Sequence, residues 1–438
     1  MLVQPLIKPI EVLRGIKVLL LLGVFPTQCQ ASDFRISSFD RSNVLAWVNA
    51  FTNGISTIER SDRLPGNWTT IQNFYTTNGS GRIRVSTLTS NCYFRLATVD
   101  VSPTFQGFSN LVASYSILRT VAGNGTGGVD AVNYWQPVYE GGPATNAALS
   151  RPHFAMTDNG GNIFIVDKDS HSVLKVTTDG IIHTVAGTHT PGNGPDSPTS
   201  GTEVQLNAPN GLWVRGDGTV YVLDTGNGKI RRLGTNGVMT TLVADGNGIT
   251  GGRGLWVRDD EGLAYYSDNP DVKKWVPGGS LSTLNSKSFV DLGNLVVDSA
   301  NNLIVTDRGA NRVYRLNSDG SRDPIAGDGT INNVVDGAIA LNTGLYGVRG
   351  VWALPNRGYL LATHEGSQIL YLDAGGVIHV FVDGARGNIH AGDGDYFYSP
   401  GLKVSEVRSV SVDSQGNVLI TESDYGYVRR IDFQRLTP

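Results

Sequence analysis

The chain has 438 residues, including 55 glycines, and its formal net charge is −4. This length is sufficient for one large domain and a small one, and the many glycines are typical of a protein with many tight turns. The near balance of charge and the lack of a Lys/Arg-rich run argue against a nucleic-acid partner.

Residues 1–31 are predicted to be a secretory signal segment. Three basic residues lead into the short apolar run 18–25, and Ala31 provides the small residue expected before a cleavage point. The run is too short to cross a bilayer, and no other segment is apolar enough to do so. Cleavage leaves Cys92 as the only cysteine, so we expect no intrachain disulfide and a bacterial protein that is secreted, periplasmic or bound at the cell surface.

Residues 32–102 are predicted to form a small antiparallel β-sandwich. Short runs rich in Val, Ile, Thr, Phe and Tyr alternate with Gly/Asn/Pro turns, and Trp47 and Trp68 are the expected core aromatics. The stretch ERSDRLPGNWTTI followed by CYFRLATVD resembles the fibronectin-III-like modules of exported bacterial proteins, and the resemblance implies a spacer or adhesion unit. Residues 103–115 are expected to be a linker.

The rest of the chain, 116–438, is built from a repeated unit. The clearest copy, residues 210–233, contains three β-strand runs joined by GDG and TGNG turns. The residue that ends the second run recurs every 39 to 58 positions, as Asp167, Asp224, Asp268, Asp307, His364 and Glu422. A period of about 40 to 50 residues with four strands per unit indicates a blade of a β-propeller.

The repeat also predicts how the ring of blades closes. A fourth strand follows five of the six copies, but the sixth copy reaches the end of the printed sequence without one. The run SILRTVAG at 116–123, ahead of the first copy, has the pattern of the missing strand. We therefore expect an all-β protein with a six-bladed propeller whose last blade is completed by the strand 116–123.

The copies and their connectors point to a known family. Units such as APNGLWVRGDGTVYVLDTGNGKIRRL and connectors such as TVAGTHTPGNGPDSPTSGTEVQLNAP resemble the NHL repeats of exported bacterial proteins. The resemblance implies an NHL-like six-bladed propeller. It does not select a function, because NHL propellers include protein-binding, RNA-binding and catalytic domains.

The residues just before the first strands form the candidate site. Because the first strand of a blade is innermost, these residues should meet at one mouth of the central channel. In blade order they are Pro152, Asn210, Arg253, Gly293, Arg349 and Arg408. Three converging arginines need either an anionic ligand, such as a carboxylate or an acidic sugar, or carboxylate neighbours such as Asp268, Glu422 or Glu406.

His153 lies one position later in this alignment and completes the candidate ligand-binding set of Arg253, Arg349, Arg408, Asn210 and His153. In propeller enzymes resembling the peptide-amidating lyases, histidines from several blades share a zinc ion at such a position. Only one blade supplies a histidine here, so no metal ligand or catalytic residue is assigned. The carboxylates that end the second strands are expected to accept N–H groups of the following turns.

Acidic, Gly-rich connectors such as 393–395 raise the alternative of calcium, although turn-forming aspartates explain them better. No other cofactor is expected.

The sequence favours a monomeric binding protein that uses the connector face and channel mouth to recognise a protein or carbohydrate. The alternative is a lyase or lactonase-like hydrolase, with or without a divalent ion, acting on a small anionic substrate at the channel mouth. The arginine ring favours the enzyme, but we prefer binding because the histidine cluster is missing and no evident general base has the right neighbours.

Overall fold

A computed structural model describes residues 8–12, 16–22, 35–39, 43–48, 50–63, 66–85, 93–244, 248–387 and 389–435. The chain forms two compact units, one made of residues 1–116 with 432–438 and the other of residues 117–431. Nearly all regular structure is β-strand. No helix among the described residues is long and apolar enough to cross a membrane.

The first unit contains two sheets. One sheet has the order β1-β2-β8-β5-β6, with β1 (Lys8–Val12), β2 (Ile16–Leu22), β8 (Tyr93–Asp100), β5 (Gly54–Ser61) and β6 (Thr69–Thr76). The other has the order β3-β4-β7, with β3 (Arg35–Phe39), β4 (Val44–Val48) and β7 (Gly81–Arg84). The first two strands lie within the range assigned to a signal segment, and the expected cleavage point at Ala31 lies outside the described residues.

The two sheets share one apolar core, as expected of a β-sandwich. Trp47 of β4 is 5% exposed and packs in a cluster with Ile58 of β5 and Phe94 of β8. Trp68 is only half-buried and lies beneath the Arg95 guanidinium, 4.7 Å from it, so it is a rim residue and not part of the core.

The range 103–115, expected to be a linker, contains the helix α1 (Phe105–Val112). Thr104 caps its N-terminus by accepting a hydrogen bond from the Gly107 N–H. Phe108, Leu111 and Val112 follow the helical spacing and are buried. This short amphipathic pattern explains why the segment is helical.

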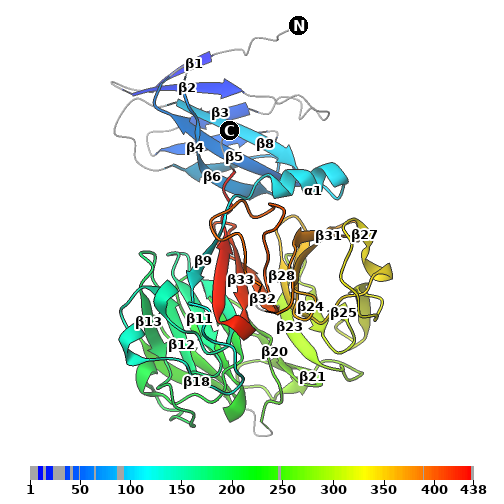
Figure 1. Ribbon diagram of the computed structural model, residues 1–438. Helices are drawn as coiled ribbons and strands as arrows, with labels where there is room; N and C mark the ends of the chain where they lie inside the picture. The colour runs from blue at the N-terminus through cyan, green and yellow to red at the C-terminus, as the bar shows by residue number, and fades with distance from the viewer. Residues whose placement is uncertain are drawn as a thin grey trace. The chain divides into compact units, whose positions relative to one another are not determined.

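The second unit is a six-bladed β-propeller (Figure 1). Blade 1 contains β10 (Pro152–Thr157), β11 (Ile163–Asp167), β12 (Ser172–Val176) and β13 (Ile182–Ala186). Blade 2 contains β15 (Gly211–Val214), β16 (Val220–Asp224), β17 (Lys229–Leu233) and β18 (Val238–Ala244). Blade 3 contains β19 (Leu255–Val257), β20 (Ala264–Asp268), β21 (Asp271–Trp275) and β22 (Ser282–Thr283). Blade 4 contains β23 (Leu292–Val297), β24 (Leu303–Asp307), β25 (Arg312–Leu316) and β26 (Arg322–Ala326). Blade 5 contains β28 (Val348–Ala353), β29 (Tyr359–Thr363), β30 (Gln368–Leu372) and β31 (Val377–Val382). Blade 6 contains β32 (Val407–Val412), β33 (Val418–Glu422), β34 (Tyr427–Ile431) and β9 (Leu118–Ala122). Two short edge strands, β14 (Thr199–Ser200) and β27 (Ala338–Ile339), extend blades 2 and 5.

The closure of the ring is as predicted. Strand β9 pairs antiparallel with β34, with Leu118 opposite Ile431 and Ala122 opposite Val428. All four side chains are fully buried, so this pairing both satisfies the edge of β34 and completes the apolar core of the last blade.

The first strands of the six blades surround the propeller axis. Each of β10, β15, β19, β23, β28 and β32 contacts the first strand of the next blade, and β32 contacts β10. Apolar clusters fill the spaces between neighbouring blades, as between blades 1 and 2, where Val166 and Val222 are fully buried. The rigid inner wall therefore positions whatever side chains lie at the ends of the first strands.

Candidate functional site

A small cavity lies where the first strands begin. It is lined by His153, Phe154, Asn210, Arg253, Asn294, Arg349 and Arg408. Every blade contributes at least one of these residues, and all five predicted ligand-binding residues are among them. The cavity has about 10 Å³ of room for the centre of a water molecule, which is the space of about one water or one small anion.

β-Bulges direct three of these side chains toward the cavity. The ladder between the first and second strands shifts register after Pro152, Val348 and Val407, so His153, Arg349 and Arg408 are the extra residues of their strands. Such bulges re-aim a side chain while leaving the ladder on both sides intact. This signal was not visible in the amino-acid pattern.

The register corrects the sequence alignment at two points. Pro152 pairs with Asp167 as Val348 pairs with Thr363, so His153 is equivalent to Arg349 and does not lie one position later. The same pairing makes Thr363 the last residue of β29, which places His364 one position beyond the strand end.

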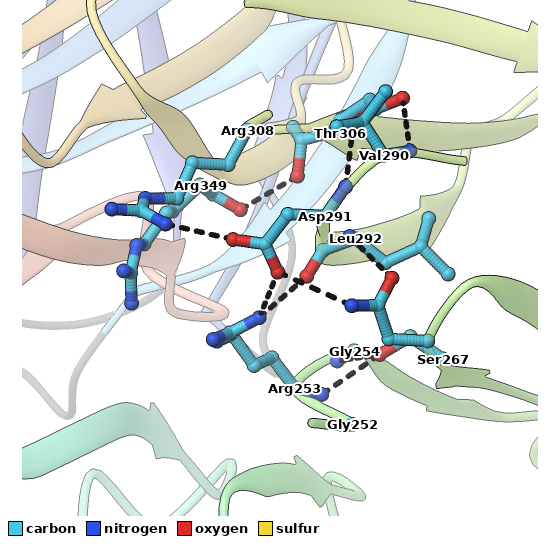
Figure 2. Close-up of polar contacts among 12 residues, drawn as sticks. Gly252, Arg253, Gly254, Ser267, Val290, Asp291, Leu292, Thr306, Arg308 and Arg349 are labelled. Carbon is cyan, nitrogen blue, oxygen red and sulfur yellow. Dashed lines mark hydrogen bonds and ion pairs between the residues drawn. The ribbon is translucent and has the colours of Figure 1, made fainter. Parts of the chain in front are cut away.

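On one side of the cavity, Arg253 belongs to an ion-pair chain (Figure 2). Its Nη1 donates to Asp291 Oδ1 at 2.9 Å and to the Leu292 carbonyl at 2.9 Å. Asp291 Oδ2 accepts from Arg308 Nη1 at 2.8 Å, and Arg308 Nε donates to Glu365 Oε1 at 2.8 Å. Burial alone would raise the pKa of Asp291, but the adjacent Arg253 and Arg308 guanidinium groups lower it.

On the other side, Arg408 is 8% exposed and has three polar neighbours. Its Nη1 donates to His153 Nε2 at 2.8 Å, and its Nη2 donates to Asp424 Oδ1 at 2.9 Å and lies 3.3 Å from His364 Nε2. Asp424 also accepts from Arg151 Nη2 at 2.8 Å. Burial alone would raise the pKa of Asp424, but the His364 hydrogen bond and the two arginines hold it well below its usual range.

Arg349 lies between these two groups without an ion pair of its own. It is 6% exposed, and within the described part of the chain its Nε and Nη1 atoms have no hydrogen-bond partner. Burial lowers the pKa of Arg349 to about 8, and the charges of Arg408, Arg253 and Arg308 act in the same direction, whereas the charge of Glu365 opposes them. The Thr306 hydroxyl fixes the backbone here by donating to the Arg349 carbonyl at 2.7 Å (Figure 2).

The tautomer of His153 follows from its partner. A guanidinium only donates, so His153 Nε2 accepts from Arg408 and the ring proton resides on Nδ1. His153 is 4% exposed, and among the described residues Nδ1 has no partner. Burial, reinforced by the Arg408 charge, holds the pKa of His153 well below 6.5, so the ring is a neutral N–H donor next to the cavity.

The arginines do not pair with the carboxylates named from the sequence. Arg253 uses Asp291 and Arg408 uses Asp424, whereas Glu422 pairs with Arg429 and Glu406 lies next to Arg386. The partners come from the neighbouring blade or the turn after the second strand, and nothing in a single repeat indicates which of several acidic residues is close enough.

The carboxylates at the second-strand ends have a structural role. The predicted contact with the following turn is present at Asp307, which accepts from the Ala310 N–H at 3.3 Å, but three other copies use different donors. Asp167, Asp224 and Glu422 accept N–H groups of Ser150, Asn207 and Ser405 at 2.7–2.8 Å. These donors lie in the connector that enters the blade, not in the following turn. The carboxylates thus tie each connector to the inner wall of the propeller.

Three tryptophans narrow the channel three residues further along the first strands. Trp213 of blade 2 stacks with Trp352 of blade 5 at 5.9 Å between ring centroids, and its ring lies 6.2 Å from Trp256 of blade 3. Blades 2 and 5 face each other across the axis, so these rings fill the channel there. The tryptophans therefore mark the side of the cavity that faces away from the connectors.

The acidic connectors contain turn-forming and ion-paired aspartates. Asp328 accepts from the Thr330 N–H at 2.7 Å, and Asp196 pairs with Lys229 and Arg231. Within the ranges that the structure describes, no group of three or more His, Cys, Asp or Glu side chains is arranged to hold a metal ion. No residues are therefore assigned to calcium or zinc.

No model of a known protein family matches the chain, and no curated protein matches it. Solved structures do resemble it. A Bacteroides thetaiotaomicron protein of unknown function has a TM-score of 0.55 and 12% identity, over 93% of this chain and 99% of that one. Two proteins named auxiliary nutrient binding proteins, from Bacteroides ovatus and B. thetaiotaomicron, each have a TM-score of 0.54 and 13% identity. The matches cover 89% and 92% of this chain, and 93% and 98% of the two Bacteroides chains, respectively. At these identities the likeness shows the shared propeller fold, while the NHL and fibronectin-III-like resemblances stay predictions.

Proposed function

We propose that the protein is an exported recognition propeller that binds an anionic group of a carbohydrate or protein ligand at the connector-side mouth of its channel. The observation that carries the proposal is Arg349, a guanidinium 6% exposed without an ion pair among the described residues. A buried cation without a counter-ion is strongly unfavourable, so an anion in the adjacent cavity stabilises it. Export rests on the predicted signal segment at residues 1–31.

The charge balance of the mouth supports a singly charged group. Together with the unpaired Arg349, the ion-paired groups around the mouth amount to six cations and five carboxylates. The cations are Arg151, Lys168, Arg253, Arg308, Arg349 and Arg408, and the carboxylates are Asp130, Asp169, Asp291, Glu365 and Asp424. One positive charge is left over. A carboxylate tip or a monovalent ion supplies the matching charge in the space of about one water molecule.

The donors at the cavity also suit an anion. Arg349 Nε and Nη1, Arg408 Nε and His153 Nδ1 are all buried without partners within the described ranges. The Asn210 Oδ1 atom is likewise unpaired, and a half-turn of that amide presents its NH₂ group instead. We prefer binding to catalysis because the neutral His153 offers a proton donor to the cavity and its other nitrogen is occupied by Arg408.

The test is a thermal-shift and calorimetric titration of the purified protein with acetate, glucuronate and glucose. Nutrient-like acidic sugars are included because two proteins of the same fold are named as nutrient binding. We expect acetate and glucuronate to raise the melting temperature and glucose to have no effect. A ligand at 100 times its Kd stabilises by about 2.7 kcal/mol.

The matched controls are Arg349→Met, which removes the unpaired cation, and Arg258→Met, which removes a surface arginine paired with Asp260. The response to acetate should disappear in the first variant and persist in the second. An acetate response that is equal in both variants, or none in the wild type, would overturn the proposal.

A further inference from the structure

A second cavity lies away from the channel, between blades 4 and 5. Its volume is about 550 Å³, within the range of small-molecule sites. Ile304 and Ile325 of blade 4 and Leu372 of blade 5 form an apolar floor, together with the ring of Tyr359. None of the residues around the channel mouth lines it, so it is independent of the site proposed above.

Two arginines lie at the edge of this cleft. Arg315 comes from β25 and Arg357 from the turn between β28 and β29, and both are exposed. Among the described residues neither forms an ion pair. The cleft therefore combines an apolar floor with two unpaired guanidinium groups at its edge and two carboxylates in its wall.

The equivalent junction between blades 2 and 3 is closed by opposite charges. Arg232 opposes Tyr221, the second residue of β16, as Arg315 opposes Ile304, the second residue of β24. Arg232 Nε donates to Glu261 Oε1 at 2.7 Å, and Glu261 lies in the corresponding turn of blade 3. At the junction of blades 4 and 5 that turn presents Arg357 instead, and two like charges cannot close the gap.

Two carboxylates also line the cleft, those of Asp298 and Asp373, and both are held by partners other than the arginines. Asp373 is 5% exposed, and its Oδ1 accepts from the N–H groups of Gly375 and Val377 at 2.8 and 2.9 Å. Asp298 accepts from the N–H groups of Ala300 and Asn302 at 2.9 and 2.8 Å and from Asn302 Nδ2 at 2.9 Å. Its Oδ2 also accepts from the Tyr359 hydroxyl at 2.7 Å. These contacts occupy both oxygens and fix the hairpin and the aromatic floor, so Arg315 and Arg357 remain available to a ligand.

The backbone at Arg357 has a conformation that glycine adopts easily. Arg357 has a φ of 65°, in the left-handed region that disfavours a long side chain. The residue in the same place relative to the end of the second strand is Gly161, Gly218 or Gly416 in three other blades. The corresponding turns of blades 3 and 4 carry Glu261 and Asn301 at φ values of 57° and 63°, so this turn accepts other residues as well as glycine. Replacing Arg357 by glycine therefore leaves the backbone conformation of the turn unchanged.

We infer that this cleft binds an organic anion with an apolar body, whose carboxylate is held by Arg315 and Arg357 while the body packs on Tyr359 and the aliphatic floor. Guanidinium groups match the geometry of a carboxylate, and the apolar floor favours a ring or alkyl group over a hydrated ion.

The experiment is calorimetry with benzoate as the probe, carried out on the Arg349→Met protein so that the channel mouth does not contribute. Acetate supplies the charge alone and benzyl alcohol the ring alone. We expect saturable binding of benzoate that is at least 10-fold tighter than that of either fragment, and at least a 10-fold loss in Arg357→Gly. Glycine suits this φ, so that variant should be at least as thermostable as its parent.

Arg258→Met in the same background is the matched control and should bind benzoate normally. Binding that is absent, unchanged in Arg357→Gly, or equalled by sulfate would overturn the inference. These outcomes say nothing about the channel mouth, which is tested with acetate in the protein that retains Arg349.

Discussion

Replacing Arg349 by methionine should stabilise the protein in the absence of a bound anion. Lowering the pKa of this guanidinium from 12.5 to about 8 corresponds to a cost on the order of 6 kcal/mol for its charged form. Replacement of buried charged groups by apolar residues of similar volume is neutral or stabilising by about 1–4 kcal/mol. We therefore expect Arg349→Met to gain about 1–3 kcal/mol, because methionine fills a similar length without a charge.

The assay is thermal and denaturant unfolding in a buffer whose only anion is a sulfonate. The three-oxygen sulfonate group is larger than the planar tip of a carboxylate, and the cavity of about 10 Å³ has room for only about one water molecule. A gain of this size raises the melting temperature of a large domain by a few degrees. On addition of acetate the wild type should gain stability and overtake or approach the variant, which should not respond.

Arg408→Met is the matched control, because Arg408 is buried to a similar degree but is paired with Asp424. Removing one partner of a buried pair costs about 3 kcal/mol or more, so this variant should lose stability in every buffer. If Arg349→Met is destabilised to the same extent as Arg408→Met in anion-free buffer, Arg349 is a structural residue and the reasoning is wrong.

Three further outcomes test parts of the account. Leu118→Ala in β9 should cost about 2–5 kcal/mol in urea unfolding, because Leu118 is 0% exposed in the closing strand; a loss under 0.5 kcal/mol would contradict the closure. The wild type should lose stability as pH falls below about 6.5, because the pKa of His153 is lowered in the folded state and only the unfolded state then binds a proton at this ring. His153→Gln should remove this loss. The difference between the two proteins should change by up to about 1.4 kcal/mol per pH unit in that range, and parallel profiles would count against a buried neutral ring. Thr306→Val should cost about 1–3 kcal/mol, because it removes the hydrogen bond that the buried Thr306 hydroxyl donates to the Arg349 carbonyl at 2.7 Å. It should also weaken the acetate response; an unchanged response would mean that this contact does not position Arg349.

The blades and their closure could be predicted because they follow from local pattern. Each copy carries its own strand runs and turns, and the run 116–123 matches the missing fourth strand without any knowledge of contacts. The convergence of Arg253, Arg349 and Arg408 followed from one rule, that first strands surround the axis. The structure brings those side chains together as that rule requires.

The details of the site could not be predicted because they depend on register and on contacts between blades. The bulges at His153 and Arg349 shift the alignment by one residue, and only the pairing of Thr363 with Gln368 shows where β29 ends. The choice of Asp291 as the partner of Arg253 depends on the distance between two blades. Periodicity carries no information about either.

The helix α1 and the cleft between blades 4 and 5 show the same limit. The helix has only one buried stripe over eight residues, with Gly107 inside it, so the pattern is too short to stand out from a linker. The cleft arises because the turn of blade 5 carries Arg357, whereas the corresponding turn of blade 3 carries Glu261, which pairs with Arg232 and closes its junction. This difference is apparent only when the junctions are compared in space.

The most direct test of the central claim is a crystal structure of the protein grown in sodium bromide, with anomalous diffraction recorded at the bromine edge. Bromide is a singly charged anion that is heavy enough to be located without ambiguity. The account predicts an anomalous peak in the cavity, within hydrogen-bonding distance of Arg349 and next to His153 Nδ1. A cavity that holds only a water molecule bridging Arg349 to Glu365 would contradict it.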